Sequence, residues 1–398
     1  MSTKESWTMP SSYMPNEFLS YGKQWIGDDD IAAVVKVLKG EYLTQGPSVG
    51  EFEEAIREVT GAKYCVAVAN GTAALHLAVA ALDIPPGMSG ITSPITFAAS
   101  ANCMSYCGLK PEFADIDEKT ICIDPGEVEK KIHSSTRLLV PVHFAGIPAD
   151  MDRLSVLARK HGLRVIEDAA HAIGSQYPNG MPVGSCYNSD MTIFSFHPVK
   201  TITTGEGGAI TTNDEKIYDN LLLLRSHGIT KDPRFLKDNP GPWYYEMQAL
   251  GYNYRLTDMQ AALGVSQMKK LNAFVARRRE IVRIYESGFA GLPWMRLHRE
   301  PDGAVSAFHL FAVEIDFLSI GRTRTEVMKQ LISRGIGTQV HYIPVHTLPY
   351  YRRQGGSSPT DFPKAMRYYE HALSLPLYPK MRDQDVQYII ESVKAIGA

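Results

Sequence analysis

One lysine lies between a strand and a glycine-rich turn in the stretch Ser195-Phe196-His197-Pro198-Val199-Lys200-Thr201-Ile202-Thr203-Thr204-Gly205-Glu206-Gly207-Gly208. Residues 191–196 are rich in β-branched and aromatic side chains, which favours a strand. Pro198 ends strand pairing because it has no N–H to donate, and the glycines let other backbone approach closely. A lysine there could form a Schiff base with an aldehyde once burial makes its amine neutral. Taken alone, Lys200 is more often a solvated surface charge.

Composition describes an ordinary globular protein. The chain has 398 residues, 44% of them hydrophobic and 21% charged, which favours two domains or one large α/β domain with an appendage. A formal net charge of −2 gives no electrostatic case for binding nucleic acid or an anionic membrane. No apolar run approaches the roughly 18 residues of a membrane span, so none is predicted.

The cysteine pattern predicts reduced thiols and a cytoplasmic protein. The five cysteines are odd in number and form no CxxC pair or other metal-binding spacing, so no metal site is predicted. They are Cys65, Cys103, Cys107, Cys122 and Cys186.

Helices and apolar strands alternate through the first half of the chain, which predicts a mostly parallel sheet in an α/β fold. Ligands of such sheets collect beyond the carboxyl ends of the strands, where His143, Asp168 and Lys200 would all lie. No GxGxxG motif follows the first strand, which disfavours a dinucleotide site. The predicted strands are 64–69, 90–94, 111–116, 138–143, 163–167 and 191–196.

A short turn joins the first strand to its helix. Asn70-Gly71-Thr72 precedes a strong helical sequence at 73–82, and the free N–H groups of a helix N-terminus suit a phosphate. Taken alone, these residues are more often an ordinary βα turn. The turn is not a Walker loop, because it lacks a Gly-Lys-Ser/Thr ending.

The second half of the chain contains two long helices, and its sequence pattern changes after Pro293. Long helices are predicted at 258–271 and 274–288, the latter with arginines that we expect on a solvated face, and residues 230–245 read as a connection or lid. A smaller α+β unit follows, with strands at 308–315 and 337–342 and helices at 323–333, 363–373 and 383–395. We therefore expect a partly disordered extension at 1–20, a large domain at 21–275 and a small domain at 276–398.

The candidate residues match the needs of pyridoxal 5′-phosphate (PLP). That cofactor requires a lysine for its aldehyde, a carboxylate for its pyridinium nitrogen, donors for its phosphate and an aromatic face over its ring. Lys200, Asp168, the Gly71-Thr72 turn and Phe97 supply one candidate for each. Phe97 considered alone would be a core residue, so the agreement of the set carries the inference.

Four blocks resemble the signatures of the DegT-type nucleotide-sugar aminotransferases, in the order that the family shows. They are Asn70-Gly71-Thr72-Ala73-Ala74-Leu75, Glu167-Asp168-Ala169-Ala170-His171, the Ser195 to Gly208 stretch, and Gly251-Tyr252-Asn253-Tyr254-Arg255. The resemblance covers about residues 20–398. It implies PLP-dependent fold type I, the aspartate-aminotransferase-like fold, with a large PLP-binding domain and a smaller C-terminal α+β domain.

The resemblance also implies roles for individual residues. Lys200 is the Schiff-base lysine and Asp168 the partner of the pyridine nitrogen, so these two are the expected catalytic residues. Gly71, Thr72, Ala73 and Ser195 match phosphate contacts, Phe97 matches the stacking aromatic, and His171 stands where many relatives place a glutamine near the cofactor ring oxygen. Asn253 matches an asparagine that reaches the phosphate of the neighbouring subunit, which implies a homodimer with shared active sites. Tyr21, Thr44, Arg255 and Tyr342 are the expected substrate contacts, with Arg255 on the diphosphate.

Three further blocks resemble the branch of the family that makes a 4-amino sugar for pseudaminic acid. They are His197 to Thr204, His341-Tyr342-Ile343-Pro344 and Ser374 to Pro379. This resemblance implies transfer of an amino group from L-glutamate to the C4 keto group of a UDP-linked 2-acetamido-2,6-dideoxy-4-keto hexose. Alternatives are another nucleotide-linked keto sugar (dTDP-, GDP- or 3-keto), a PLP-dependent dehydratase, in which histidine replaces the lysine, and a PLP- or sugar-binding regulator without turnover.

Overall fold

A central sheet organises the larger part of the molecule. The computed structural model describes residue 13, residues 15–354 and residues 358–397, and within them seven strands pair in the order β1-β7-β6-β5-β4-β2-β3. The expected extension at 1–20 therefore lies mostly outside the described residues. The strands are β1 Tyr64–Val68, β2 Ser89–Thr92, β3 Lys110–Phe113, β4 Thr136–Val140, β5 Arg164–Asp168, β6 Met191–Ser195 and β7 Gly208–Thr212.

Strand direction confirms the mostly parallel sheet. Strands β6, β5, β4, β2 and β3 run parallel to one another, whereas β7 is antiparallel to both β1 and β6. The connection 196–207 contains no helix and turns straight back, so that Ser195 pairs with Gly208. A parallel strand would have required a longer crossover. The lysine-bearing stretch is thus the loop of an antiparallel pair.

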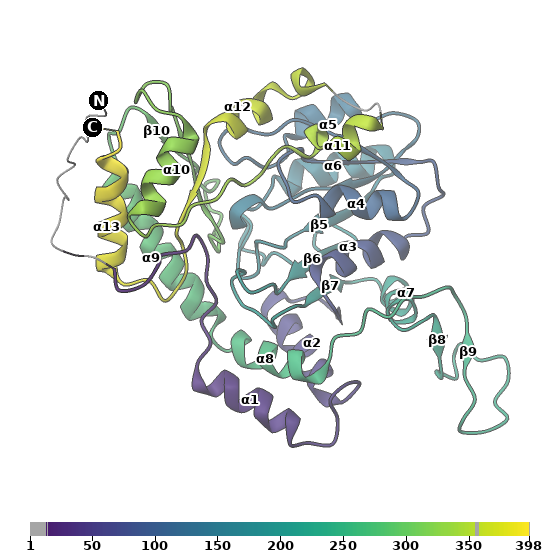
Figure 1. The fold of residues 1–398 in the computed structure, drawn as a ribbon. Coiled ribbons are helices and arrows are strands. Elements are labelled where there is room, and N and C mark those ends of the chain that lie inside the picture. Colours follow the sequence, from purple (N-terminus) through teal and green to yellow (C-terminus); the bar gives the residue numbers. More distant parts are fainter. Residues whose placement is uncertain (1–12, 14, 355–357, 398) are drawn as a thin grey trace.

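Helices cover both faces of this sheet (Figure 1). Alternate residues of β1 point to opposite faces, as the two-residue period of a strand requires. Val66 and Val68 pack with α3, α4 and α7, whereas Cys65 and Ala67 belong to the core with α2, α5, α6 and α8. The helices are α1 Asp28–Leu38, α2 Pro47–Thr60, α3 Gly71–Ala80, α4 Ala99–Tyr106, α5 Pro125–Lys131, α6 Met151–His161, α7 Glu215–Arg225 and α8 Asp258–Met268.

A second unit surrounds a small antiparallel sheet. Strands β10 Met295–Leu297, β11 Phe311–Ile315 and β12 Ala372–Leu375 pair in that order. The helices α9 Leu271–Phe289, α10 Arg324–Ser333 and α13 Asp383–Lys394 contribute to the apolar core around them. Leu19 joins this unit through backbone bonds to Gly335 and Gly337. The proposed domain boundary near residue 275 lies within α9, which runs from one unit to the other (Figure 1).

Two sequence expectations for this unit were wrong. Residues 337–342 form no ladder strand, because only Gln339 bridges to Ser374 there. The helix expected to reach residue 373 ends at His371, since the next residues turn into β12. Helices α11 Pro349–Arg353 and α12 Pro363–His371 instead pack back on the large core through Tyr351, Ala365 and Tyr368.

The arginines of α9 do not all face solvent, contrary to expectation. Arg283 is exposed, but Arg278 is fully buried and its Nη1 donates to the carbonyls of Phe308, His309 and Leu377 at 3.3, 3.2 and 3.0 Å. Burial lowers the pKa of Arg278 to about 10. The helix therefore ties two loops of the small unit together through one buried cation.

An arm extends from the body of the molecule after α7 (Figure 1). Its two short strands, β8 Ile229–Thr230 and β9 Glu246–Met247, pair antiparallel. They lie at the two ends of residues 230–245, the predicted connection or lid. Trp243, Tyr245 and Met247 are exposed on this arm. None of the helices in the described ranges has the length and apolarity needed to cross a membrane.

Candidate active site

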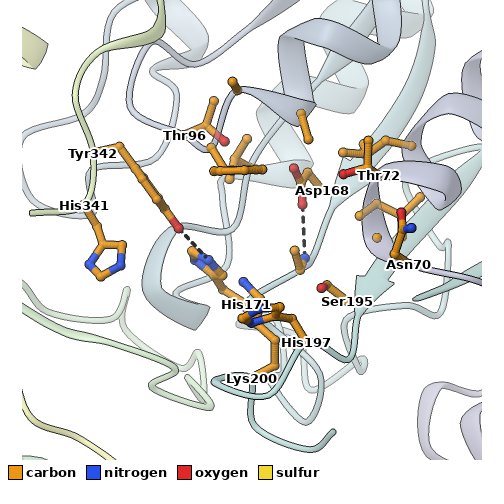
Figure 2. A pocket seen from close by; sticks show the side chains of 18 of the residues that line it. Asn70, Thr72, Thr96, Asp168, His171, Ser195, His197, Lys200, His341 and Tyr342 are labelled. Carbon is orange, nitrogen blue, oxygen red and sulfur yellow. Dashed lines mark hydrogen bonds between the residues drawn. The ribbon is translucent and has the colours of Figure 1, made fainter. Parts of the chain in front are cut away.

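One large cavity opens where the strands of the central sheet end. It has a volume of about 1200 Å³ and is lined by the ends of β5 and β6, the start of α3 and the segment 339–345 (Figure 2). Its lining contains ten of the predicted site residues: Tyr21, Gly71, Thr72, Ala73, Phe97, Asp168, His171, Ser195, Lys200 and Tyr342.

Lys200 lies in the loop between β6 and β7. Hydrogen bonds within this loop hold its two sides together. The Thr203 hydroxyl and the Thr204 N–H both donate to the Phe196 carbonyl, at 3.0 Å each. Gly205 completes the turn with a φ of +80°, a conformation that L side chains rarely adopt. Burial lowers the pKa of Lys200 from 10.5 to about 8, and the charge of Asp168 opposes that shift. The amine is thus prepared to act as a nucleophile near neutral pH.

Asp168 presents a buried carboxylate at the end of β5. The Ser100 hydroxyl donates to its Oδ2 at 2.6 Å, and the Ala170 N–H donates to its Oδ1 at 3.1 Å. Each carboxylate oxygen can accept more than one hydrogen bond, so capacity remains for a donor from the cavity. An N–H on a bound ring would meet a fixed negative charge there.

The start of α3 forms an anion cradle. Asn70 caps the helix by accepting the Ala73 N–H at 2.8 Å, which leaves the earlier N–H groups of Gly71 and Thr72 without partners inside the helix. A Cβ on Gly71 would lie 2.8 Å from the Ser195 Cβ, so only glycine lets the two segments meet. The helix dipole and these N–H groups favour a phosphate beside Ser195.

Aromatic and histidine side chains form the opposite side of the cavity. Phe97 is 62% exposed, so it is not the core residue that a lone aromatic would usually be. Its ring lies 6.4 Å from that of Tyr342, whose hydroxyl is 3.0 Å from Nε2 of buried His171 (Figure 2). Burial, followed by the charge of Lys200, lowers the pKa of His171, so its ring is neutral.

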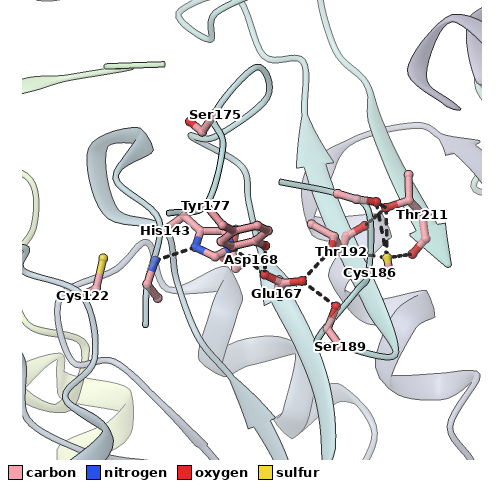
Figure 3. A network of polar contacts seen from close by, with 12 residues as sticks. Cys122, His143, Glu167, Asp168, Ser175, Tyr177, Cys186, Ser189, Thr192 and Thr211 are labelled. Carbon is pink, nitrogen blue, oxygen red and sulfur yellow. Dashed lines mark hydrogen bonds and ion pairs between the residues drawn. The ribbon is translucent and has the colours of Figure 1, made fainter. Parts of the chain in front are cut away.

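A second polar network supports the strand that carries Asp168 (Figure 3). Glu167 points to the other face of the sheet, where it accepts hydrogen bonds from His143 at 2.9 Å, Thr192 at 2.9 Å and the hydroxyl of Tyr177. Burial alone would raise the pKa of Glu167, but the bond and charge of His143 are foremost among the contacts that lower it. His143 is therefore a buried structural histidine and does not line the cavity, although its strand end suggested that it could.

Three predicted residues lie outside the cavity of their own chain. Thr44, Asn253 and Arg255 are absent from its lining, and each forms a backbone bridge elsewhere, to Thr257, Ser226 and Val68 respectively. Among the residues that the structure describes, the Arg255 side chain has no hydrogen bond or ion pair. The resemblance assigned Asn253 to the neighbouring subunit, and these positions are compatible with that arrangement.

Several residues in or next to the cavity were missed by sequence reasoning. Ser100, which holds Asp168, carries no local signal because a serine in a helix is most often unremarkable. His309 and His341 come from a different unit, and nothing in the spacing of the chain indicates that they meet Lys200. His76, Tyr106, Tyr252 and Tyr254 form an aromatic cluster at the other end of the cavity, with the rings of Tyr252 and Tyr254 stacked 5.1 Å apart.

The donor set fits PLP. One cavity brings together a lysine with a lowered pKa, a buried carboxylate and a helix N-terminus. These groups would meet the aldehyde, the ring nitrogen and the phosphate of PLP, respectively. The N–H of Ala73 already bonds Asn70, so Gly71 and Thr72 are the freer phosphate donors. No group of His, Cys, Asp and Glu side chains within the described ranges is arranged to hold a metal ion.

Known proteins share this sequence and fold. The model of the DegT/DnrJ/EryC1/StrS aminotransferase family matches residues 24–394. The spore coat polysaccharide biosynthesis protein SpsC of Bacillus subtilis is 44% identical over 382 residues, which cover 96% of this chain and 97% of SpsC. Helicobacter pylori PseC, an aminotransferase involved in the biosynthesis of pseudoaminic acid, superposes with a TM-score of 0.88 at 31% identity, covering 96% of this chain and 99% of PseC. The PLP form of Spr1654 from Streptococcus pneumoniae gives 0.87 at 30% identity, covering 95% and 98% of the two chains.

Proposed function

The chain belongs to the DegT/DnrJ/EryC1/StrS aminotransferase family, and from that premise we propose that it moves the amino group of L-glutamate to the C4 keto carbon of a UDP-linked 2-acetamido-2,6-dideoxy-4-keto hexose. That it is a PLP-dependent sugar aminotransferase follows from the family and from neighbours solved in PLP and PMP forms. The observation that carries the proposal is the meeting of Lys200 and Asp168 in one cavity that also holds an anion cradle.

When bound, the cofactor supplies an aldehyde and an electron-withdrawing ring. Gly71, Thr72 and Ser195 bind its phosphate, and Phe97 covers the ring. Asp168 holds a proton at the ring nitrogen, and Ser100 keeps its carboxylate in place. Lys200 would hold the aldehyde of the cofactor and, as a free amine, would move a proton to and from the substrate α-carbon as general base and acid. A pKa of about 8 leaves both protonation states accessible for that task.

The cavity is large enough for a nucleotide sugar. Tyr21, Gln339 and Tyr342 line it from segments outside the sheet, opposite the cofactor residues, so we assign the sugar to their side. A UDP diphosphate needs cationic donors, and the Arg255 guanidinium would bind it in a bidentate way. The likeness to PseC, an aminotransferase involved in the biosynthesis of pseudoaminic acid, supports the pseudaminic acid branch for this chain.

We also propose that two copies share their active sites. Helix α1 exposes Ile31, Val35 and Leu38, which lie on one face at helical spacing, and no element in the described ranges buries them. Asn253 and Arg255 lie outside their own cavity, as residues that serve a neighbour would. A second copy on this face would bury the stripe. The five free cysteines support a cytoplasmic location.

A substrate panel tests the proposal. Purified protein loaded with PLP and given L-glutamate is incubated with UDP-, dTDP- and GDP-linked 4-keto-6-deoxy sugars and with a 3-keto sugar, and the amino sugars are identified by mass spectrometry and NMR. We expect preference for the UDP-linked 2-acetamido 4-keto sugar and a 4-amino product. Preference for a dTDP, GDP or 3-keto substrate would overturn the substrate assignment. Loss of sugar oxygen without amino transfer would indicate a dehydratase, and no turnover at all would indicate a binding protein.

A further inference from the structure

The ring of His171 is held between two groups on opposite sides. The backbone N–H of Ala145 lies 3.3 Å from its Nδ1, and the hydroxyl of Tyr342 lies 3.0 Å from its Nε2 (Figure 2). An N–H can only donate, whereas a hydroxyl can donate or accept. The Ala145 contact therefore decides which ring nitrogen of a neutral imidazole carries the proton.

Ala145 cannot easily turn its N–H away. It lies inside the short 3₁₀ turn Phe144–Gly146 with a φ of +57°, and the Phe144 carbonyl, which shares one peptide plane with the Ala145 N–H, accepts the N–H of Ile147 at 2.9 Å. Gly146, the next residue, packs so closely that a Cβ there would lie 2.9 Å from the His171 carbonyl. With the peptide fixed from both sides, Nδ1 of His171 must accept and Nε2 must carry the proton.

This tautomer determines the direction of the next hydrogen bond. Nε2–H donates to the Tyr342 oxygen, so the hydroxyl proton of Tyr342 is left to point elsewhere. Within the described residues, no other group accepts it, and Tyr342 lines the cavity that Lys200 and Asp168 share. Burial raises the pKa of Tyr342, so the phenol keeps its proton and can donate it in a hydrogen bond.

The position of Tyr342 favours a substrate atom as the acceptor. Asp168, Ser195, Lys200 and the Gly71-Thr72 turn, which fit the cofactor, all belong to the large sheet and its loops. Tyr342 comes from the segment that precedes the 3₁₀ turn Val345–Thr347 and faces the cavity from the opposite side (Figure 2). A carbonyl oxygen brought to Lys200 from that side would meet the free hydroxyl.

We propose that His171 is a positioning residue that fixes Tyr342 as a hydrogen-bond donor, and that Tyr342 donates to the keto oxygen of the acceptor sugar. His171 then acts through Tyr342 and has no nitrogen left for the cofactor ring oxygen. The bond polarises the carbonyl before the amino group attacks, and it requires no proton to leave Tyr342. This inference rests on the proposed function in one respect, because the acceptor is taken to be a keto sugar.

The two half-reactions separate this role from a general structural one. Stopped-flow absorbance follows the two half-reactions separately. In the glutamate step, L-glutamate converts bound PLP to its amine form. In the return step, the keto sugar converts that form back to PLP. We expect Tyr342→Phe to slow the return step roughly 10- to 100-fold, as loss of one hydrogen bond to a reacting oxygen does, and to leave the glutamate step within about threefold. Equal slowing of both steps would assign the hydroxyl to the cofactor and overturn the proposal.

Variants of His171 test the positioning role. His171→Gln keeps an acceptor for Ala145 and a donor for Tyr342, so we expect a return step within about threefold of wild type. His171→Leu removes both, so it should match Tyr342→Phe, and combining the two changes should add nothing further. Additive losses, or a glutamine variant as slow as the leucine variant, would contradict the proposal that His171 acts through Tyr342.

A measurement without cofactor or substrate keeps the test independent of activity. In cofactor-free protein labelled with ¹⁵N-histidine, the NMR resonances of His171, assigned through His171→Gln, should show a protonated Nε2 and an unprotonated Nδ1. The opposite tautomer would overturn the proposal even if the kinetics agreed. If the protein acts on no keto sugar, the wild type itself will lack the return step. That failure concerns the proposed function, and the NMR result still decides the tautomer.

Discussion

The charge of Asp168 acts on Lys200 across the cavity. Burial pushes the Lys200 amine towards its neutral form, and the charge of Asp168 limits how far. The result, a pKa of about 8, is far from the 10.5 of an ordinary lysine and close to the pH at which enzymes work. Neither residue alone produces this value.

The pH dependence of cofactor capture follows from that pKa. Only the neutral amine attacks an aldehyde, so the rate at which cofactor-free protein captures PLP should rise about tenfold per pH unit below pH 8 and level off above it. Stopped-flow absorbance measures this rate directly. A rate that keeps rising towards pH 10 would show that Lys200 titrates as a solvated lysine.

Asp168→Asn supplies the matched comparison for this profile. The change keeps the shape of the side chain but removes the charge that raises the pKa of Lys200, so the plateau should begin at a lower pH. A plateau that stays in place or moves to higher pH would contradict the coupling.

At the scale of elements, the contact between the start of α3 and the end of β6 decides whether the cradle exists. Gly71→Ala would place a Cβ 2.8 Å from the Ser195 Cβ and push the two segments apart. We expect PLP to bind at least about tenfold more weakly, because the helix N–H groups move away from the phosphate. Equilibrium titration of cofactor-free protein with PLP measures the dissociation constant.

Gly50→Ala is the control for Gly71→Ala, since a Cβ on Gly50 in α2 would meet nothing within 4 Å. It should leave PLP affinity unchanged and stabilise its helix by up to about 1 kcal/mol. Unchanged affinity in Gly71→Ala would show that the close approach is not needed for the cradle.

Helix α9 offers a second test at this scale. Arg278→Leu leaves the carbonyls of Phe308, His309 and Leu377 without their buried donor, so we expect it to lower the free energy of unfolding by about 2 kcal/mol. Arg283→Leu, on the exposed side of the same helix, should change it by no more than about 0.5 kcal/mol. Urea denaturation of cofactor-free protein measures both, and similar midpoints for the two variants would contradict the buried role.

Sequence periodicity predicted the large sheet because its strands are short apolar runs bounded by turns. It failed at residues 337–342, because residues 339–342 line the cavity and only Gln339 forms a strand-like bridge. It also misplaced Arg278, since a helical pattern does not reveal that carbonyls from residues 308–309 and 377 converge on one position. The gathering of Lys200, Asp168 and Gly71 could be predicted from strand ends, but His309 and Tyr342 reach the cavity only through the packing of the second unit.

For the molecule as a whole, shared sites can be tested by mixing two inactive variants. If Asn253 serves the neighbouring subunit, hybrids of Lys200→Ala and Asn253→Ala chains each contain one intact site. Random mixing should then restore up to about a quarter of wild-type activity. Differently tagged chains verify hybrid formation, and no recovery in verified hybrids would place Asn253 in its own site.

Conversion of the cofactor by L-glutamate depends on Lys200. In Lys200→Ala protein, the phosphate cradle and Phe97 should still hold PLP, but L-glutamate should leave its absorbance spectrum unchanged over many wild-type turnover times. The exposed surface variant Lys216→Ala should convert at the wild-type rate. Glutamate-dependent conversion of PLP by Lys200→Ala at a rate near wild type would contradict the account.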